Sequence, residues 1–303
     1  MSLTKSQQIL SLGSLNPPIN HAQLPVLSNT KALILKGAWN LIRSSSDFLV
    51  LSSALPSLRE FHCTYHKPKT GAYIAMCDSL RQGFPSTITH LNLCLEGLYT
   101  KNASSLKKWR KLYPTHHICR NLGAIAPQLE SLTYTGRVCS TLFSSALEAA
   151  NKTHGSCARL KTIDIVVNNV CREHGAHNDG TGIHNWPFVQ AFEVLVLKAV
   201  RSLHTFSKIT NMRIRFIDLD SPAPLLNPMF HLEGGRAWGL WSEEILAALR
   251  EARPQVRFGV SSSASLEEEA ELLGRRMVVS GLGRYRCMTS GYYRAMAHAG
   301  GVW

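Results

Sequence analysis

Cysteine and histidine are the residues of this 303-residue chain best suited to metal chemistry. The densest group lies in a polar, glycine-containing stretch and consists of Cys171, His174, His177 and His184. Thiolate and imidazole are zinc ligands, but the spacing Cys-x-x-His-x-x-His has no second pair at a standard separation, so a polar loop is the better interpretation. The same weakness applies to His116, His117 and Cys119, which we interpret as a helix end with exposed imidazoles.

The eight cysteines are scattered and never form a Cys-x-x-Cys pair. Three of them, Cys63, Cys77 and Cys94, stand where a small apolar residue would suit a strand or helix core. We therefore expect reduced structural thiols, no metal site and no cofactor.

Candidate catalytic groups are sparse. No Gly-x-Ser-x-Gly turn is present, and Gly281-Leu-Gly283 does not follow a clear strand, so a phosphate-binding loop is not indicated. Asp218 and Asp220 fall on the same face of an expected strand, where they could share a proton or hold a cation; more often such a pair ends a strand in solvent. The sequence therefore predicts a protein that is not an enzyme.

A repeated apolar spacing predicts the elements that would position these side chains. Apolar residues recur at i, i+3 and i+5, each time followed by a helix-like segment, in four sets: Leu58, Phe61 and Cys63; Ile88, Leu91 and Leu93; Leu129, Leu132 and Tyr134; Leu160, Ile163 and Ile165. This recurrence predicts an α/β fold, a leucine-rich-repeat-like solenoid in the form of an open horseshoe, with one parallel sheet, helices on the convex side and irregular repeats.

The expected strands cover residues 31–36, 59–65, 88–95, 130–135, 160–167, 212–219 and 256–260. The expected helices cover residues 39–55, 70–81, 117–125, 140–150, 187–203, 242–250 and 265–275. Gly234-Gly235, with Trp238 and Trp241, is expected to form an aromatic loop, and the longest intervals between strands, before 130–135 and before 212–219, must carry insertions. We expect a loose N-terminal arm at 1–22, a solenoid with a C-terminal capping unit at 23–277 and a disordered basic tail at 278–303.

Alternation within the strands places a set of polar residues on the sheet face opposite the leucines. We predict that this concave face binds a protein partner, although it could equally be a solvated surface; the candidate contacts are Glu60, His62, His90, Asn92, Thr133, Asp164, Arg213 and Arg215. The insertion that contains Lys107 to Pro114 adds Trp109, Arg110 and Tyr113 as candidate interface anchors. The alternative is that its aromatic residues fold inward and its basic residues are solvated.

Positive charge is concentrated in the first half of the chain, where residues 1–163 contain 18 Lys and Arg against 6 Asp and Glu. Such a balance favours an acidic protein partner or, as the alternative function, nucleic-acid binding, although a solvated basic surface would look the same. No apolar run approaches the length of a membrane span, and residues 1–20 lack the apolar core of a secretion signal. We therefore expect no membrane partner and an intracellular protein, cytoplasmic or nuclear.

Residues 30–260 resemble the leucine-rich-repeat portion of fungal F-box-type proteins. The resemblance is carried by the strand motifs Leu58-Arg-Glu-Phe61-His-Cys63 and Thr89-His-Leu91-Asn-Leu93-Cys-Leu95-Glu-Gly97 and by the segments 109–117, 178–186, 213–220 and 239–246. It implies the substrate-binding part of a cullin-type ubiquitin ligase adaptor, in which an F-box binds a Skp-type adaptor and the repeats hold the target. No Leu-Pro-x-Glu-Ile pattern of an F-box precedes the first expected strand.

Overall fold

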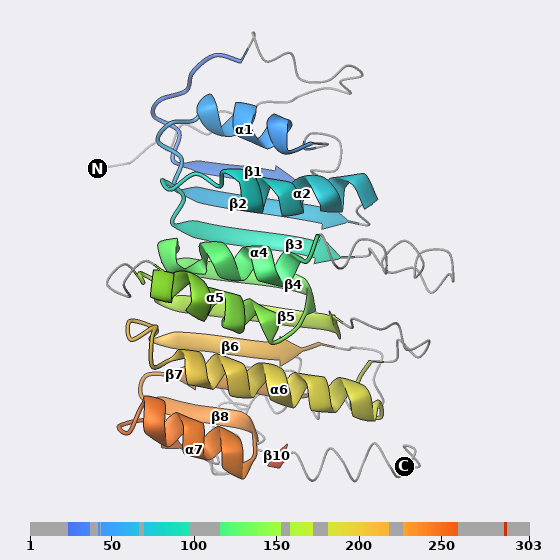
Figure 1. Ribbon diagram of the computed structural model, residues 1–303, viewed down its shortest axis with the longest axis vertical. Helices are drawn as coiled ribbons and strands as arrows, with labels where there is room; N and C mark the ends of the chain where they lie inside the picture. Colours follow the sequence, from blue (N-terminus) through green and yellow to red (C-terminus); the bar gives the residue numbers. More distant parts are fainter. Residues whose placement is uncertain are drawn as a thin grey trace, which may run out of the picture.

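A computed structural model describes residues 24–36, 42, 44–66, 70–96, 116–152, 158–171, 181–217, 227–259 and 288–289. Its centre is an open, mostly parallel sheet that is not closed into a barrel, with strands in the order β1-β2-β3-β4-β5-β6-β7-β8-β10 and β9 paired with β8. The helices lie along one side of this sheet (Figure 1). The fold is therefore mixed α/β, as the sequence predicts.

Strands and helices alternate through most of the chain. The first half contains β1 (Ala32–Lys36), α1 (Ser45–Ser53), β2 (Glu60–His66), α2 (Thr70–Gln82), β3 (His90–Glu96), α4 (Ile118–Ile125), the 3-10 helix η2 (Ala126–Gln128), β4 (Ser131–Val138) and α5 (Thr141–Lys152). The second half contains β5 (Thr162–Val170), α6 (Trp186–Ser202), β6 (Asn211–Phe216), β7 (Met229–Glu233), β8 (Arg236–Trp241), α7 (Glu243–Ala252), β9 (Arg257–Phe258) and β10 (Met288–Thr289).

The parallel order ends after β6, which corrects the prediction of a wholly parallel sheet. β7 runs antiparallel to β6 and to β8, and the expected aromatic loop is the turn and second strand of this β7–β8 hairpin. Gly234 and Gly235 connect the two strands with φ of 55° and 78°, a conformation that favours glycine and fits a tight two-residue hairpin turn. The hairpin needs no crossover helix, so the sheet can continue without one between β6 and β8.

A row of buried apolar residues runs across the parallel strands in register. Phe61 pairs with Leu91, Leu91 with Leu132, Leu132 with Ile163 and Ile163 with Met212. All five side chains are at most 2% exposed. Ile214 stands two residues after Met212 in β6 and pairs with Ile165; it also faces the helices, because side chains alternate along a strand.

The turns that enter the strands also repeat. The backbone N–H groups of Leu58, Ile88, Leu129 and Ile209 each donate to the carbonyl three residues earlier, and all four side chains are buried. Two residues further on, the N–H of Glu60, His90, Ser131 and Asn211 donates to the carbonyl of the preceding unit. The same local geometry therefore recurs although the intervals between strands differ in length.

Capping residues fix where three of the helices begin. Ser44 and Asp47 form a capping box at the start of α1, Asn185 accepts from the N–H of Phe188 at the start of α6, and Ser242 accepts from the N–H of Ile245 at the start of α7. The expected arm (1–22) and terminal helix (265–275) lie outside the described residues, as does the expected tail (278–303) apart from β10.

Candidate functional site

The eight strand residues predicted to contact a partner lie together on one face of the sheet. His62, Asn92, Thr133, Asp164 and Arg213 pair in register and form one continuous row. Glu60 and His90 pair in the row on one side of it, and Arg215 belongs to the row on the other side. The strand register places these residues on one face, and the binding role of this open face stays a prediction. Trp109, Arg110 and Tyr113 lie outside the described residues.

An ion-pair cluster lies on the part of the open face formed by β5 and β6. Arg213 donates from Nε to Asp164 Oδ1 at 3.1 Å and from Nη2 to Oδ2, and Arg215 Nη2 reaches Oδ2 at 3.4 Å. The hydrogen bond to Asp164 raises the pKa of Arg213. One carboxylate therefore holds two guanidinium groups in place on the sheet, and the cluster retains a net positive charge.

The hairpin extends this row with an aromatic pair. His231 pairs with Arg213 across β6 and β7 and with Trp238 across β7 and β8. The His231 and Trp238 rings lie 4.4 Å apart at their centroids, at an interplanar angle of 60°. Burial lowers the pKa of His231, although Glu233, 3.6 Å away, acts in the opposite direction. The imidazole is therefore harder to protonate than a free one.

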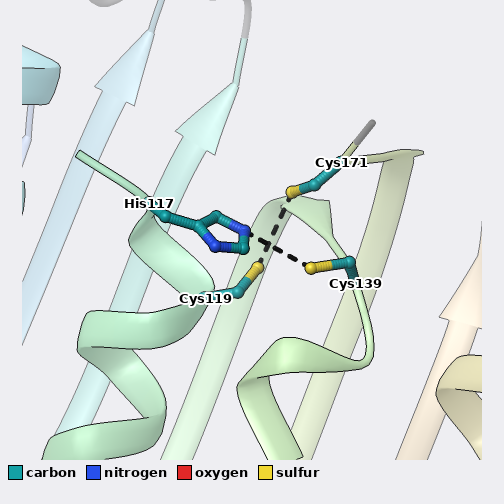
Figure 2. A group of neighbouring side chains, drawn as sticks. All are labelled: His117, Cys119, Cys139 and Cys171. Atoms are coloured by element: carbon teal, nitrogen blue, oxygen red, sulfur yellow. Dashed lines mark hydrogen bonds between the residues drawn. The ribbon is translucent and has the colours of Figure 1, made fainter. Parts of the chain in front are cut away.

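A second cluster lies at the edge of the sheet where parallel strands end, and the sequence spacing does not indicate it. It consists of His117, Cys119, Cys139 and Cys171, whose ligand atoms all lie within 4.8 Å of one another. His117 Nε2 lies 3.3 Å from Cys139 Sγ, and Cys119 Sγ lies 3.7 Å from Cys171 Sγ. Figure 2 shows the four side chains converging from α4 and from the chain just after β4 and β5. We call these four residues the thiol–imidazole cluster.

Strand register explains how residues so far apart in sequence meet. Val138 and Val170 pair at the ends of β4 and β5, so the next residues, Cys139 and Cys171, emerge side by side. The N–H of Cys171 donates to the Val138 carbonyl at 3.2 Å, which fixes this junction. The pairing is irregular between Gly136 and Arg137, because β5 has one more residue than β4 at this point.

Helix α4 brings the other two members. His117 is its N-cap residue, without a side-chain capping bond, and Cys119 lies in its first turn. Cys119 Sγ also donates to the Arg137 carbonyl at 3.6 Å, which ties the helix start to β4. The first-turn N–H groups and the helix dipole favour negative charge here, so the position suits thiolates.

Burial and mutual hydrogen bonding shift the pKa values of the three cysteines in different directions. Burial raises the pKa of Cys119, and its bonds with Cys139 and Cys171 add to this. Hydrogen bonds from Cys119, Cys171 and His117 lower the pKa of Cys139 despite its partial burial. For Cys171 the hydrogen bond with Cys119 lowers the pKa, but the bond with Cys139 and burial outweigh it. Of the three cysteines, Cys139 therefore loses its proton most readily.

None of the other candidate ligand groups among the described residues belongs to this cluster. His174, His177, Asp218 and Asp220 lie outside the described residues, and His184 is not part of the cluster. His116, next to a cluster member, instead lies 3.7 Å from Asp78 of α2. The thiols of Cys63 and Cys77 are buried, and desolvation raises the pKa of each to about 12, which agrees with inert structural cysteines.

Comparisons with protein-family models, with curated proteins and with solved structures found no match to this chain. Within the ranges that the structure describes, every helix is too short or too polar to cross a membrane.

Proposed function

We propose that the chain is a non-catalytic protein-recognition scaffold, built as an open leucine-rich-repeat-like solenoid whose uncovered sheet face binds a protein partner. The observation that carries the proposal is the register-aligned open face, on which polar side chains from six successive strands, β2 to β7, form one row that Trp238 of β8 extends. The recurring turn at Leu58, Ile88, Leu129 and Ile209 supports the repeat interpretation.

The chemistry of the face favours a protein over a nucleic acid. Binding to a phosphate backbone requires an excess of positive charge, whereas this surface carries both positive and negative groups. Glu60 Oε2 lies 3.7 Å from His62 Nε2, and Asp164 forms ion pairs with Arg213 and Arg215. Arginine, histidine and tryptophan side chains on β6 to β8 supply the flat, partly apolar groups typical of interface anchors. A binding assay across a salt series separates the two classes, because a phosphate-based complex weakens steeply as salt rises.

Affinity purification followed by direct binding tests the proposal. A double variant of the open face, His62→Ala with Asn92→Ala, removes two side chains from the β2–β3 end of the row. The matched control, Gln190→Ala with Arg201→Ala, removes two exposed side chains from α6 on the helix side. We expect a partner that binds the wild type and the control with equal affinity and the open-face variant at least ten times more weakly; equal binding of all three proteins would contradict the proposed surface.

A more specific proposal, which the resemblance to F-box-type proteins supports, is that the chain is the substrate-binding part of a ubiquitin ligase adaptor. If the chain acts there, a Skp-type adaptor should co-purify with it from native extract. Reproducible absence of the adaptor, with a partner still bound to the open face, would contradict the ligase role but not the scaffold function.

A further inference from the structure

We propose that His117, Cys119, Cys139 and Cys171 bind one Zn²⁺ ion as a structural site that fastens the start of α4 to the ends of β4 and β5. The first support is the choice of donors. Three sulfurs and one imidazole nitrogen form a common ligand set of structural zinc, and they do not suit magnesium or calcium, which take oxygen ligands.

The second support is the size of the cluster. Tetrahedral zinc, with Zn–S of about 2.3 Å and Zn–N of about 2.0–2.1 Å, separates sulfur from sulfur by about 3.8 Å and sulfur from nitrogen by about 3.6 Å. The observed separations are 3.7 Å between Cys119 Sγ and Cys171 Sγ and 3.3 Å between His117 Nε2 and Cys139 Sγ. The side chains therefore already approximate the corners of a zinc tetrahedron, and small rotations complete it.

The same distances argue against other uses of the thiols. A disulfide requires sulfurs about 2.05 Å apart, so Cys119 and Cys171 would have to approach each other by well over 1 Å. A two-iron cluster would place two metal atoms and their bridging sulfides between the ligands, which leaves too little space when all four ligand atoms lie within 4.8 Å.

The local charge also suits this ion. Three thiolates, a neutral imidazole and Zn²⁺ carry one net negative charge, which is costly to bury alone. Arg137 is only 3% exposed, and its positive charge acts on the Cys171 thiol. The start of α4 adds the positive end of a helix dipole. The surroundings therefore offset the charge of the loaded site.

Four protein ligands fill the coordination shell and leave no open position for a substrate or an activated water, which distinguishes a structural site from a catalytic one. The function of the ion is mechanical. It joins three pieces of chain that follow three successive strands, β3, β4 and β5, at the same edge of the sheet.

Metal analysis of the full chain, purified under reducing conditions, tests the site. We expect one zinc per chain, with Cys139→Ser and Cys171→Ser each lowering the zinc content at least tenfold and Cys94→Ser leaving it unchanged. Cys94 is a suitable control because it is a half-buried cysteine in β3 that does not belong to the cluster.

Cobalt substitution keeps the test informative if a serine variant fails to fold. After removal of zinc by a chelator, wild-type protein loaded with Co²⁺ should show the visible d–d bands of a tetrahedral site and the near-ultraviolet charge-transfer band of thiolate ligands. His117→Cys should retain one cobalt and intensify the charge-transfer band. Folded wild-type protein that contains no zinc and gives no tetrahedral cobalt spectrum would overturn the proposal, as would stoichiometric iron or a Cys119–Cys171 disulfide in its place.

Discussion

Substitution of Gly123 by alanine gives the sharpest test of the packing around the thiol–imidazole cluster. A Cβ atom at Gly123 in α4 would meet the backbone of α5: it would collide with the Leu142 carbonyl oxygen and lie 2.8 Å from Ser145 Cβ and 2.9 Å from the Ala146 nitrogen. Ordinary contacts between heavy atoms are about 3.5–4.0 Å, so α4 and α5 must separate by about 1 Å.

Two effects of opposite sign determine how Gly123→Ala changes the free energy of unfolding. Alanine is favoured over glycine inside a helix by roughly 0.5–1 kcal/mol, whereas overpacking costs typically about 1–3 kcal/mol and occasionally more. Two of the three close atoms belong to the backbone and cannot rotate away, which places the cost at the upper end of that range. We therefore expect Gly123→Ala to lower the free energy of unfolding by about 2 kcal/mol.

Urea unfolding followed by circular dichroism measures this change. Gly71→Ala in α2 is the matched control, because a Cβ atom there has nothing within 4 Å, and it should be neutral or slightly stabilising. A Gly123→Ala protein as stable as the wild type would refute the close approach of α4 and α5. Because α4 also carries His117 and Cys119, the same substitution should weaken cobalt binding.

Three further substitutions probe other parts of the fold. Leu132→Ala empties a fully buried position in the central apolar row and should cost about 2–5 kcal/mol in urea unfolding, while a cost below 1 kcal/mol would contradict a shared core. Gly239→Ala places a Cβ atom 2.9 Å from the Met229 carbonyl carbon at φ of 108°, so it should break the β7–β8 pairing, seen as faster amide exchange in both strands than in β2 and β3. The lowered pKa of His231 means that the unfolded chain binds a proton more readily, so stability should fall as pH drops below about 6.5. His231→Asn should remove part of that fall, and identical pH profiles for the two proteins would contradict the burial of this imidazole.

The parallel strands could be predicted because each one carries its own signal. Leu91 and Leu132 lie in segments where apolar residues alternate and a helix pattern follows, so the sheet and its register follow from local periodicity. The β7–β8 hairpin carries a weaker signal, since Gly234-Gly235 also suits an irregular loop. The alternation of Phe230 and Leu232, followed by Ala237, is the feature that could have indicated it.

The thiol–imidazole cluster could not be predicted from spacing rules, because those rules describe ligands paired within one loop or turn. Here Cys139 stands seven residues after Leu132, and Cys171 stands eight after Ile163, although Leu132 and Ile163 are partners in the sheet. The irregularity between Gly136 and Arg137 absorbs the extra residue and brings the two cysteines level. Counting cysteines from the end of each strand, rather than from one another, would have placed them together.

The position of the cluster links it to the recognition proposal. His117 follows the segment 97–115 by two residues, and Cys171 immediately precedes the segment 172–180; neither segment is among the described residues. The first of them contains Trp109, Arg110 and Tyr113, the predicted anchors outside the sheet face.

A bound ion would fix the chain where it returns from the first segment and where it enters the second. Removal of the metal should therefore raise amide exchange at the start of α4 and at the ends of β4 and β5 while leaving β1 and β2 unchanged, and a partner that needs the 97–115 segment should then bind more weakly than one that contacts only the open face. Uniform exchange across all strands after chelation would show instead that the ion supports the whole sheet.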